Sequence, residues 1–181
     1  MANPLKILTG IFMAVCLAGG FPVLSPPVLA GQESGKLFEG FVYFADRSGT
    51  HLKARPVQFP ADLDSHGLGM KILETVLAGP ADPDLEPIWP RGTSVRAFFM
   101  GDDGRAWADL AVEGWKPNGI GIGSTDTLSE LLAVYGLVNS LTLNIPDVRQ
   151  VKILVNGSEV ASLGGHVSLE DFFTTNMLIV K

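Results

Sequence analysis

The sequence predicts an α/β fold, of the α+β type, in which two helices pack on one face of a mixed, mostly antiparallel sheet. Two stretches carry apolar residues at three- and four-residue steps, the period of a helix with one buried face. Six shorter apolar stretches are bounded by turn residues, which is typical of strands. The elements run strand, strand, helix, strand, strand, helix, strand, strand. Two layers packed around one core are the simplest arrangement that buries the apolar faces of these helices and strands.

A first strand pair and a first helix are predicted between residues 38 and 80. Phe38–Asp46 is apolar on both faces, which indicates a central strand. Leu52–Phe59 returns antiparallel to it, and Pro56 places this second strand at an edge because proline lacks a backbone N–H. A helix over His66–Ala78 follows. Gly79-Pro80 ends it, since glycine accepts positive φ and proline cannot continue the helix.

A hairpin and a longer helix are predicted next. Ser94–Met100 and Arg105–Leu110 flank a four-residue turn rich in Gly and Asp, which favours an antiparallel hairpin. The longer helix is expected to start from a cap at Thr127 and to end near Asn144, because Pro146 disfavours helical geometry in the residue before it. Thr127 and Glu130 have the spacing of a capping box, in which each side chain accepts a backbone N–H at the helix start.

The remaining chain predicts a second hairpin and a tail. Gln150–Val155 alternates in the manner of a strand with one face on a core. Asn156-Gly157 is a strong hairpin signal, and Glu159–Leu163 is the expected return strand. We expect the tail, Gly164–Lys181, to pack back on the fold at its start and to fray at its end.

Residues 1–30 are predicted to be a secretory signal peptide, followed by a short linker over residues 31–37. Lys6 precedes the uncharged apolar run Ile7–Ala18, and small residues precede a cleavage point after Ala30. One alternative is a retained membrane anchor, although the run is shorter than the ~20 residues that span a bilayer. The other is lipidation at Cys16, which the preceding valine disfavours.

Charge and cysteine content narrow the function classes. The chain has 13 basic and 19 acidic residues, and Lys6 is the only charged residue among the first 30, so cleavage leaves 12 basic against 19 acidic residues and a net charge of −7. This charge excludes nucleic-acid binding and adhesion to anionic lipid headgroups as expected functions. The single cysteine, Cys16, is lost on cleavage, so we expect no disulfide, thiolate nucleophile or cysteine-bound metal.

Several segments, taken together in order and spacing, resemble the GerMN domain of sporulation and germination proteins, over residues 38–173 of this chain. The segments that carry the resemblance are Phe41–Phe44, Leu77–Pro80, Ile88–Thr93, Asp109-Leu110, Leu137–Leu141 and Leu163–His166. Within them the family-motif positions are Gly79, Pro80, Pro90, Thr93, Asp109, Asn139, Leu141, Gly165 and His166. Ala111 departs from the family, which often has serine there.

The resemblance implies a small α/β domain, at residues 38–173 with a tail at 174–181, similar to the ring-building modules of bacterial secretion and sporulation complexes. Those modules assemble by packing helices of one copy on the sheet of the next. The resemblance implies no catalytic residues and no cofactor.

The candidate chemical groups favour structural roles. His51, His66 and His166 lack the spacing of metal ligands. We expect His51 and His66 to be solvated and His166 to hold the tail through a hydrogen bond. An acid–base arrangement of Asp109, Glu113 and Asp126 is conceivable, but a strand end explains Asp109 and the helix start explains Asp126.

Glycine and serine patterns are equally weak signals of chemistry. Gly119–Gly123 opens a helix, as phosphate loops do, but no strand directly precedes it and no Lys-Ser or Lys-Thr follows, so a connector is the favoured interpretation. Ser124 and Ser140 lack the pattern of a nucleophile elbow.

The three tryptophans are the best candidates for contact with a partner. Trp107 alternates with alanines in a strand and is expected in the core. Trp89 and Trp115 lie in loops next to proline and glycine, where a large ring often anchors an interface. Rings folded over the edge of the core are the competing interpretation.

These observations favour an exported, non-catalytic protein-binding or assembly module of the bacterial cell envelope, in the periplasm or otherwise outside the cytoplasmic membrane. Its expected partners are envelope proteins or further copies of itself, with membrane contact only through an uncleaved or lipidated N-terminus. No cofactor or metal is expected. One alternative is an envelope hydrolase built on Asp109, Glu113 and His166. Another is a small-ligand or glycan binder that uses the glycine-rich loop and its tryptophan.

Overall fold

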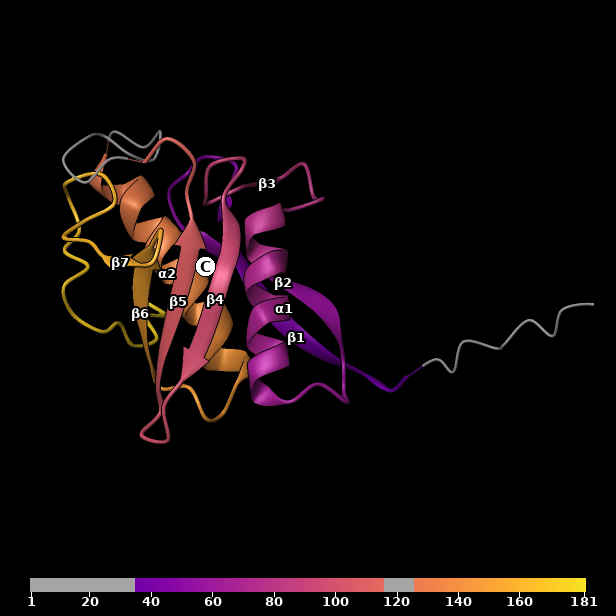
Figure 1. Ribbon diagram of the computed structural model, residues 1–181. Coiled ribbons are helices and arrows are strands. Elements are labelled where there is room, and N and C mark those ends of the chain that lie inside the picture. Colours follow the sequence, from indigo (N-terminus) through magenta and orange to yellow (C-terminus); the bar gives the residue numbers. More distant parts are fainter. Residues whose placement is uncertain (1–34, 116–125) are drawn as a thin grey trace, which may run out of the picture. The chain divides into compact units, whose positions relative to one another are not determined.

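The computed structural model of the chain describes residues 35–115 and 126–181. Residues 34–181 form one compact unit, shown in Figure 1. The predicted signal peptide (residues 1–30) with Cys16, the linker up to residue 34, Gly119–Gly123 and Ser124 lie outside the described residues.

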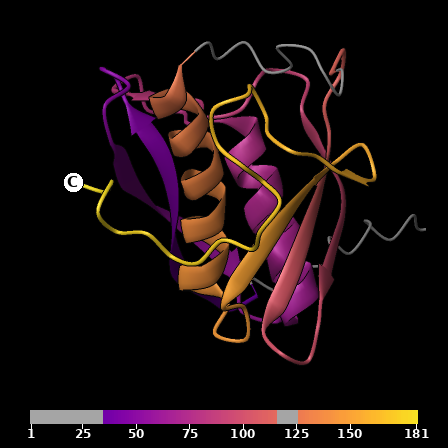
Figure 2. The ribbon, with the colours of Figure 1, turned by 90° about the vertical axis from the view of Figure 1, so that its left-hand side faces the viewer.

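Two helices and two sheets build this unit, so the predicted fold class is confirmed. The elements are β1 (Leu37–Asp46), β2 (Leu52–Pro60), α1 (Ser65–Ala78), β3 (Leu85–Glu86), β4 (Ser94–Met100), β5 (Arg105–Ala111), α2 (Thr127–Asn144), β6 (Gln150–Val155) and β7 (Ser158–Glu159). One sheet has the order β2-β1-β3 and the other β4-β5-β6-β7. Every strand pair is antiparallel except β5 with β6, which α2 connects. Figure 2 shows α2 between β1–β2 and β4–β6, with α1 behind it.

The strands were expected in one sheet, and α2 explains why there are two. Asn144 accepts the N–H of Phe41 at 2.9 Å and donates to its carbonyl at 2.6 Å, while the Ser140 hydroxyl accepts the N–H of Tyr43 at 3.0 Å. With Gly136, these residues form a stripe at four-residue steps along one face of α2. A Cβ at Gly136 would lie 3.1 Å from the carbonyl oxygen of Tyr43, so the helix approaches the strand closely. The stripe therefore takes the place of a neighbouring strand.

The main core lies where β1, both helices and the second sheet meet. Its largest side chains that are less than 2 % exposed are Phe44, Phe59, Phe98, Ile72, Leu73, Leu110, Leu137, Leu141, Ile145, Ile153 and Leu163. The C-terminal half of β1 is buried throughout, which confirms its prediction as a central strand. β2 is an edge strand, as Pro56 predicts, and Gly79 ends α1 with a φ of 80°.

The start of α2 differs from the predicted capping box. The N-cap is Asp126, whose carboxylate accepts the N–H of Ser129 at 2.8 Å and its hydroxyl at 2.8 Å. These bonds hold the pKa of Asp126 below its ordinary value. Because the cap lies one residue earlier than expected, Glu130 falls beyond the third helical position and its carboxylate is used elsewhere.

The chain after β6 also departs from expectation. Asn156 and Gly157 form the predicted turn, both with positive φ, but only Ser158–Glu159 pairs as the return strand. Val160 and Leu163 leave the strand direction to enter the core. The tail does not fray, since Val180 pairs with Leu52 at the start of β2.

Trp107 is half-buried on the outer face of β5, so its predicted core position is wrong. Its neighbours Ala106 and Ala108 face the core at 0 % exposure, whereas the Trp107 ring meets Phe172 of the tail edge-on, with centroids 5.3 Å apart. Within residues 35–115 and 126–181, neither helix is both long and apolar enough to cross a bilayer.

Candidate binding site beside Trp89

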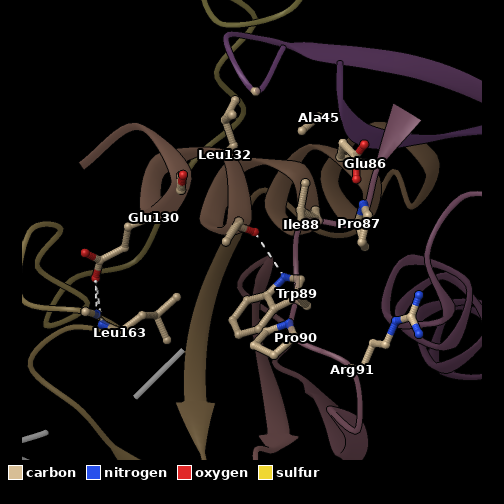
Figure 3. Close-up of a pocket in the computed structure, with 14 residues that line it drawn as sticks. Ala45, Glu86, Pro87, Ile88, Trp89, Pro90, Arg91, Glu130, Leu132 and Leu163 are labelled. Carbon is tan, nitrogen blue, oxygen red and sulfur yellow. Dashed lines mark hydrogen bonds between the residues drawn. The ribbon is translucent and has the colours of Figure 1, made fainter. Parts of the chain in front are cut away.

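An apolar cavity of about 390 Å³ lies where four segments far apart in the sequence meet. The loop 86–91 forms one wall, the first turns of α2 (129–133) form the second, and Leu163-Gly164 with Ala45 complete it (Figure 3). The volume is within the range of small-ligand pockets. Its lining is mostly aliphatic, with charged groups only at Glu86, Arg91 and Glu130.

Trp89 fixes the loop wall of this cavity to α2. The ring is 3 % exposed, and its indole N–H donates to the carbonyl of Ala133 at 3.2 Å (Figure 3). The adjacent Ile88 fits against the helix at Gly136, where an added Cβ would lie 2.2 Å from its Cδ1. Trp89 thus has the geometry of a ring folded over the edge of the core, the competing interpretation from sequence, and is not a free anchor.

Trp115, the second candidate anchor, is half-buried and packs against the main core. Its indole N–H is buried and has no hydrogen-bond partner among the described residues. Both loop tryptophans therefore contribute mainly to packing in the folded chain. Their part in binding a partner stays a prediction.

Glu130 lies in the wall of the cavity that α2 forms. The sequence did not indicate its role in this site. Its side chain points from α2 toward Leu163 (Figure 3), and the residue is 2 % exposed. One carboxylate oxygen accepts the N–H groups of Leu163 at 2.7 Å and Gly164 at 2.8 Å, and the other accepts the N–H of His166 at 2.9 Å. A buried carboxylate with three backbone donors is well compensated, so it holds this loop in place.

The three residues of the predicted hydrolase alternative are not brought together. Asp109 is 5 % exposed and is held by Arg96 Nε at 3.0 Å and the N–H of Gly157 at 2.8 Å. Glu113 and His166 are exposed. His166 does help hold the tail, as expected, but through its backbone N–H. None of the three lines the cavity.

The remaining histidines have separate environments. His51 was expected to be solvated, but its side chain is only 17 % exposed and its Nδ1 lies 3.3 Å from Asp46 Oδ1. His66 is exposed, as expected, with its ring 6.1 Å from that of Phe98. In the described part of the chain, no group of three or more His, Cys, Asp or Glu side chains could hold a metal ion.

Asp46 organises the turn between β1 and β2. Its carboxylate accepts the hydroxyl and N–H of Ser48 and the N–H groups of Thr50 and His51. The Ser48 hydroxyl bond, followed by these backbone bonds, holds the pKa of Asp46 well below its ordinary value of 3.8. The Asp46 carboxylate therefore stays ionised and stabilises the turn.

The family-motif positions have mainly structural surroundings. The buried Asn139 donates to the carbonyl of Asn176 at 2.8 Å and accepts its N–H at 2.9 Å. Leu141 is in the core, and Thr93 is buried with a hydroxyl that has no partner among the described residues. The remaining motif positions, Gly79, Pro80, Pro90, Gly165 and His166, lie in loops or at a helix end.

The Germane family model, described as sporulation and spore germination, matches residues 41–161. The chain belongs to the Germane (GerMN) family. This is a family of sporulation and germination domains and not a known enzyme family. A search of curated proteins found no match.

Solved structures share the fold of this Germane domain. The first GerMN domain of the sporulation protein GerM from Bacillus subtilis has 20% identity and a TM-score of 0.56, with 76% of this chain and 97% of that chain covered. The tandem GerMN domains of the same protein have 20% identity and a TM-score of 0.58, with 77% and 46% covered. The “Putative Lipoprotein from Clostridium perfringens” has 22% identity and a TM-score of 0.53, with 76% and 87% covered.

Proposed function

We propose that this Germane domain is an exported, non-catalytic protein-binding or assembly module of the bacterial cell envelope, which contacts a partner through the cavity beside Trp89. The observation that carries the proposal is how the buried acidic groups are used. Asp46, Asp109 and Glu130 each accept backbone N–H groups that fix a turn or loop. Carboxylates that accept backbone N–H groups stabilise a rigid surface, and they are poorly suited to transferring protons.

The relatives support the envelope setting of the proposal. One similar structure is of a protein described as a “Putative Lipoprotein”, and another is of a sporulation protein. Residues 1–30 of this chain have the pattern of a secretory signal. Together these features favour a location outside the cytoplasmic membrane.

The cavity has the composition of an interface centre with a polar rim. Its floor is aliphatic, with Leu132 and Ala133 buried, and Glu86, Pro87 and Arg91 are exposed at its edge. An apolar side chain of a partner that enters this floor would be desolvated, while the charges at the rim would set its orientation. Arg91 and Glu86 give the rim both signs of charge.

Capture from envelope fractions with the full chain as bait tests the proposal. Arg91→Glu reverses a charge at the rim, and Pro87→Glu adds a charge there; neither side chain is buried, so folding should persist. We expect each to reduce recovery of a reproducible partner about tenfold or more. Phe99→Glu is the matched control, because Phe99 is 55 % exposed on β4 and does not line the cavity. Equal recovery with all three variants would contradict the proposal.

A small-ligand binder is the second candidate, because a mostly apolar cavity of about 390 Å³ is large enough for a small molecule. Under this alternative, a compound raises the thermal midpoint of the parent chain, and Ala133→Leu, which fills the cavity, removes the shift. A protein partner would be captured without any such compound.

A further inference from the structure

The turn between β6 and β7 (Figure 1) carries Asn156-Gly157, a pair whose side chain and backbone can react with each other. The backbone nitrogen of Gly157 attacks Cγ of Asn156, and the absence of a Cβ on glycine leaves this approach open. A bond forms between that nitrogen and Cγ, the bond from Cγ to Nδ2 breaks, and Nδ2 departs as ammonia with the proton of the Gly157 N–H. Water then opens the cyclic imide at either carbonyl, which leaves aspartate or isoaspartate. The sequence therefore marks this turn as a candidate site of deamidation.

The fold binds the reacting side chain of Asn156. Its Oδ1 accepts the N–H of Val112 at 3.0 Å, and its Nδ2 donates to the carbonyl of Val112 at 3.2 Å. The strands β5 and β6 pair as far as Leu110 with Val155, so the side-chain amide takes the place of a peptide group just beyond the last pair. Turning Cγ toward the Gly157 nitrogen breaks both bonds to Val112. Breaking them is unfavourable at a residue that is 4 % exposed.

The fold also binds the attacking nitrogen of Gly157. Its N–H donates to Asp109 Oδ1 at 2.8 Å, and the other oxygen of this buried carboxylate accepts Arg96 Nε at 3.0 Å. The nitrogen has to lose its proton before it can attack. A carboxylate is far too weak a base to remove a backbone amide proton, and its negative charge opposes the amide anion that has to form. Asp109 therefore disfavours the reaction.

We propose that Asn156-Gly157 is a modification site that the folded domain keeps inert, with Asp109 and the backbone of Val112 as the protecting groups. Deamidation then requires a local opening that separates this turn from the end of β5. Either product puts a carboxylate where Nδ2 donated to the Val112 carbonyl, which also accepts the N–H of Trp115 at 3.4 Å. The modification would therefore alter the segment that carries Trp115. This inference uses neither the cavity nor a partner, so it is independent of the proposed function.

Peptide mapping by mass spectrometry tests the protection in the full chain. The chain is incubated at mildly alkaline pH, either folded or in concentrated guanidinium chloride, and conversion of the Asn156 amide to an acid is followed with time. Tryptic cleavage after Lys152 separates Asn156 from the chain's other Asn-Gly pair, Asn118-Gly119, which lies outside the described residues. We expect deamidation at Asn156 to be at least tenfold slower in the folded chain. Equal rates in the two conditions would overturn the proposal.

Variants at Asp109 test its part in the protection. Asp109→Ala removes the acceptor of the Gly157 N–H and should speed deamidation of the folded chain at least fivefold, and Asp109→Asn, which keeps an acceptor oxygen, should fall between. Asp103→Ala is the matched control, because Asp103 also binds an arginine of this hairpin, Arg105 Nε at 2.6 Å, but is exposed and precedes the start of β5. We expect the control to deamidate at the parent rate. A slower reaction in Asp109→Ala would identify Asp109 as a base and overturn its protecting role.

Two further measurements separate local protection from the stability of the whole domain. Deamidation of Asp109→Ala is measured at several low denaturant concentrations, where local opening changes the rate little and global unfolding raises it steeply. We expect a nearly constant rate, and a steep rise would overturn the proposal. If Asp109→Ala does not fold, Arg96→Ala replaces it, because the Arg96 side chain is 52 % exposed and its loss frees the Asp109 carboxylate to move. This variant should deamidate at least twofold faster than the parent, and an unchanged rate would contradict the proposal.

Discussion

Removal of the Glu130 carboxylate should destabilise the domain strongly. Glu130→Ala leaves three N–H groups without their acceptor: that of Leu163, which is buried, and those of Gly164 and His166, which are partly buried. An unsatisfied buried donor costs about 1–3 kcal/mol, and partly exposed donors recover much of this from water. We therefore expect a loss of about 3 kcal/mol in the free energy of unfolding, which corresponds to roughly 6–12 °C in the thermal midpoint of a domain of this size.

Urea unfolding followed by circular dichroism measures this loss, with Glu113→Ala as the matched control because Glu113 is an exposed acidic residue. Glu130→Gln should fall between the two, since one amide oxygen still accepts N–H groups while the amide nitrogen faces the N–H of His166. A loss below about 1 kcal/mol for Glu130→Ala would show that water or another group replaces the carboxylate, and the reasoning would be refuted.

Three further changes test other parts of the structure. Trp89→Ala should cost about 3–5 kcal/mol in urea unfolding because the ring is 3 % exposed; a loss below about 1 kcal/mol would place the ring outside the core. Gly136→Ala should cost about 1–3 kcal/mol despite alanine's helix propensity, because its Cβ would lie 2.2 Å from Ile88 Cδ1; Gly35→Ala, with nothing within 4 Å, is the control. Asp46→Asn should lower the thermal midpoint at pH 7. A carboxyl with a lowered folded pKa stabilises the fold above its unfolded pKa, so this difference should shrink as pH falls below 3.8 toward the folded pKa; a pH-independent difference would contradict this.

Local rules predicted the elements well because each signal and its consequence lie within a few residues. Pro56, Gly79 and Asn156-Gly157 act on their own backbone, so the edge strand, the helix end and the turn are as expected. Trp107 shows the limit of such rules. Alternation with Ala106 and Ala108 was identified correctly, but a period of two does not say which face of a strand meets the core.

The candidate site was less predictable because its contacts join distant parts of the sequence. Glu130 has a plausible local role in a capping box, yet its partners begin 33 residues further along the chain. Asn139 and Lys152 are ordinary polar residues in the sequence, yet both are buried, and each donates to a backbone carbonyl of the tail, 37 and 18 residues further along the chain. The cavity beside Trp89 needs four segments to meet, and no pattern within any one segment indicates it.

The helix stripe that covers β1 has a consequence for how the chain matures. Phe41 and Asn144 are 103 positions apart, so a ribosome releases the first hairpin long before the segment that shields it. During this interval the peptide groups of Phe41 and Tyr43 are open to any neighbouring extended chain, and such edges are where aggregation begins. Replacing Asn144 should therefore lower the yield of soluble protein more than it lowers the stability of the chain that has already folded.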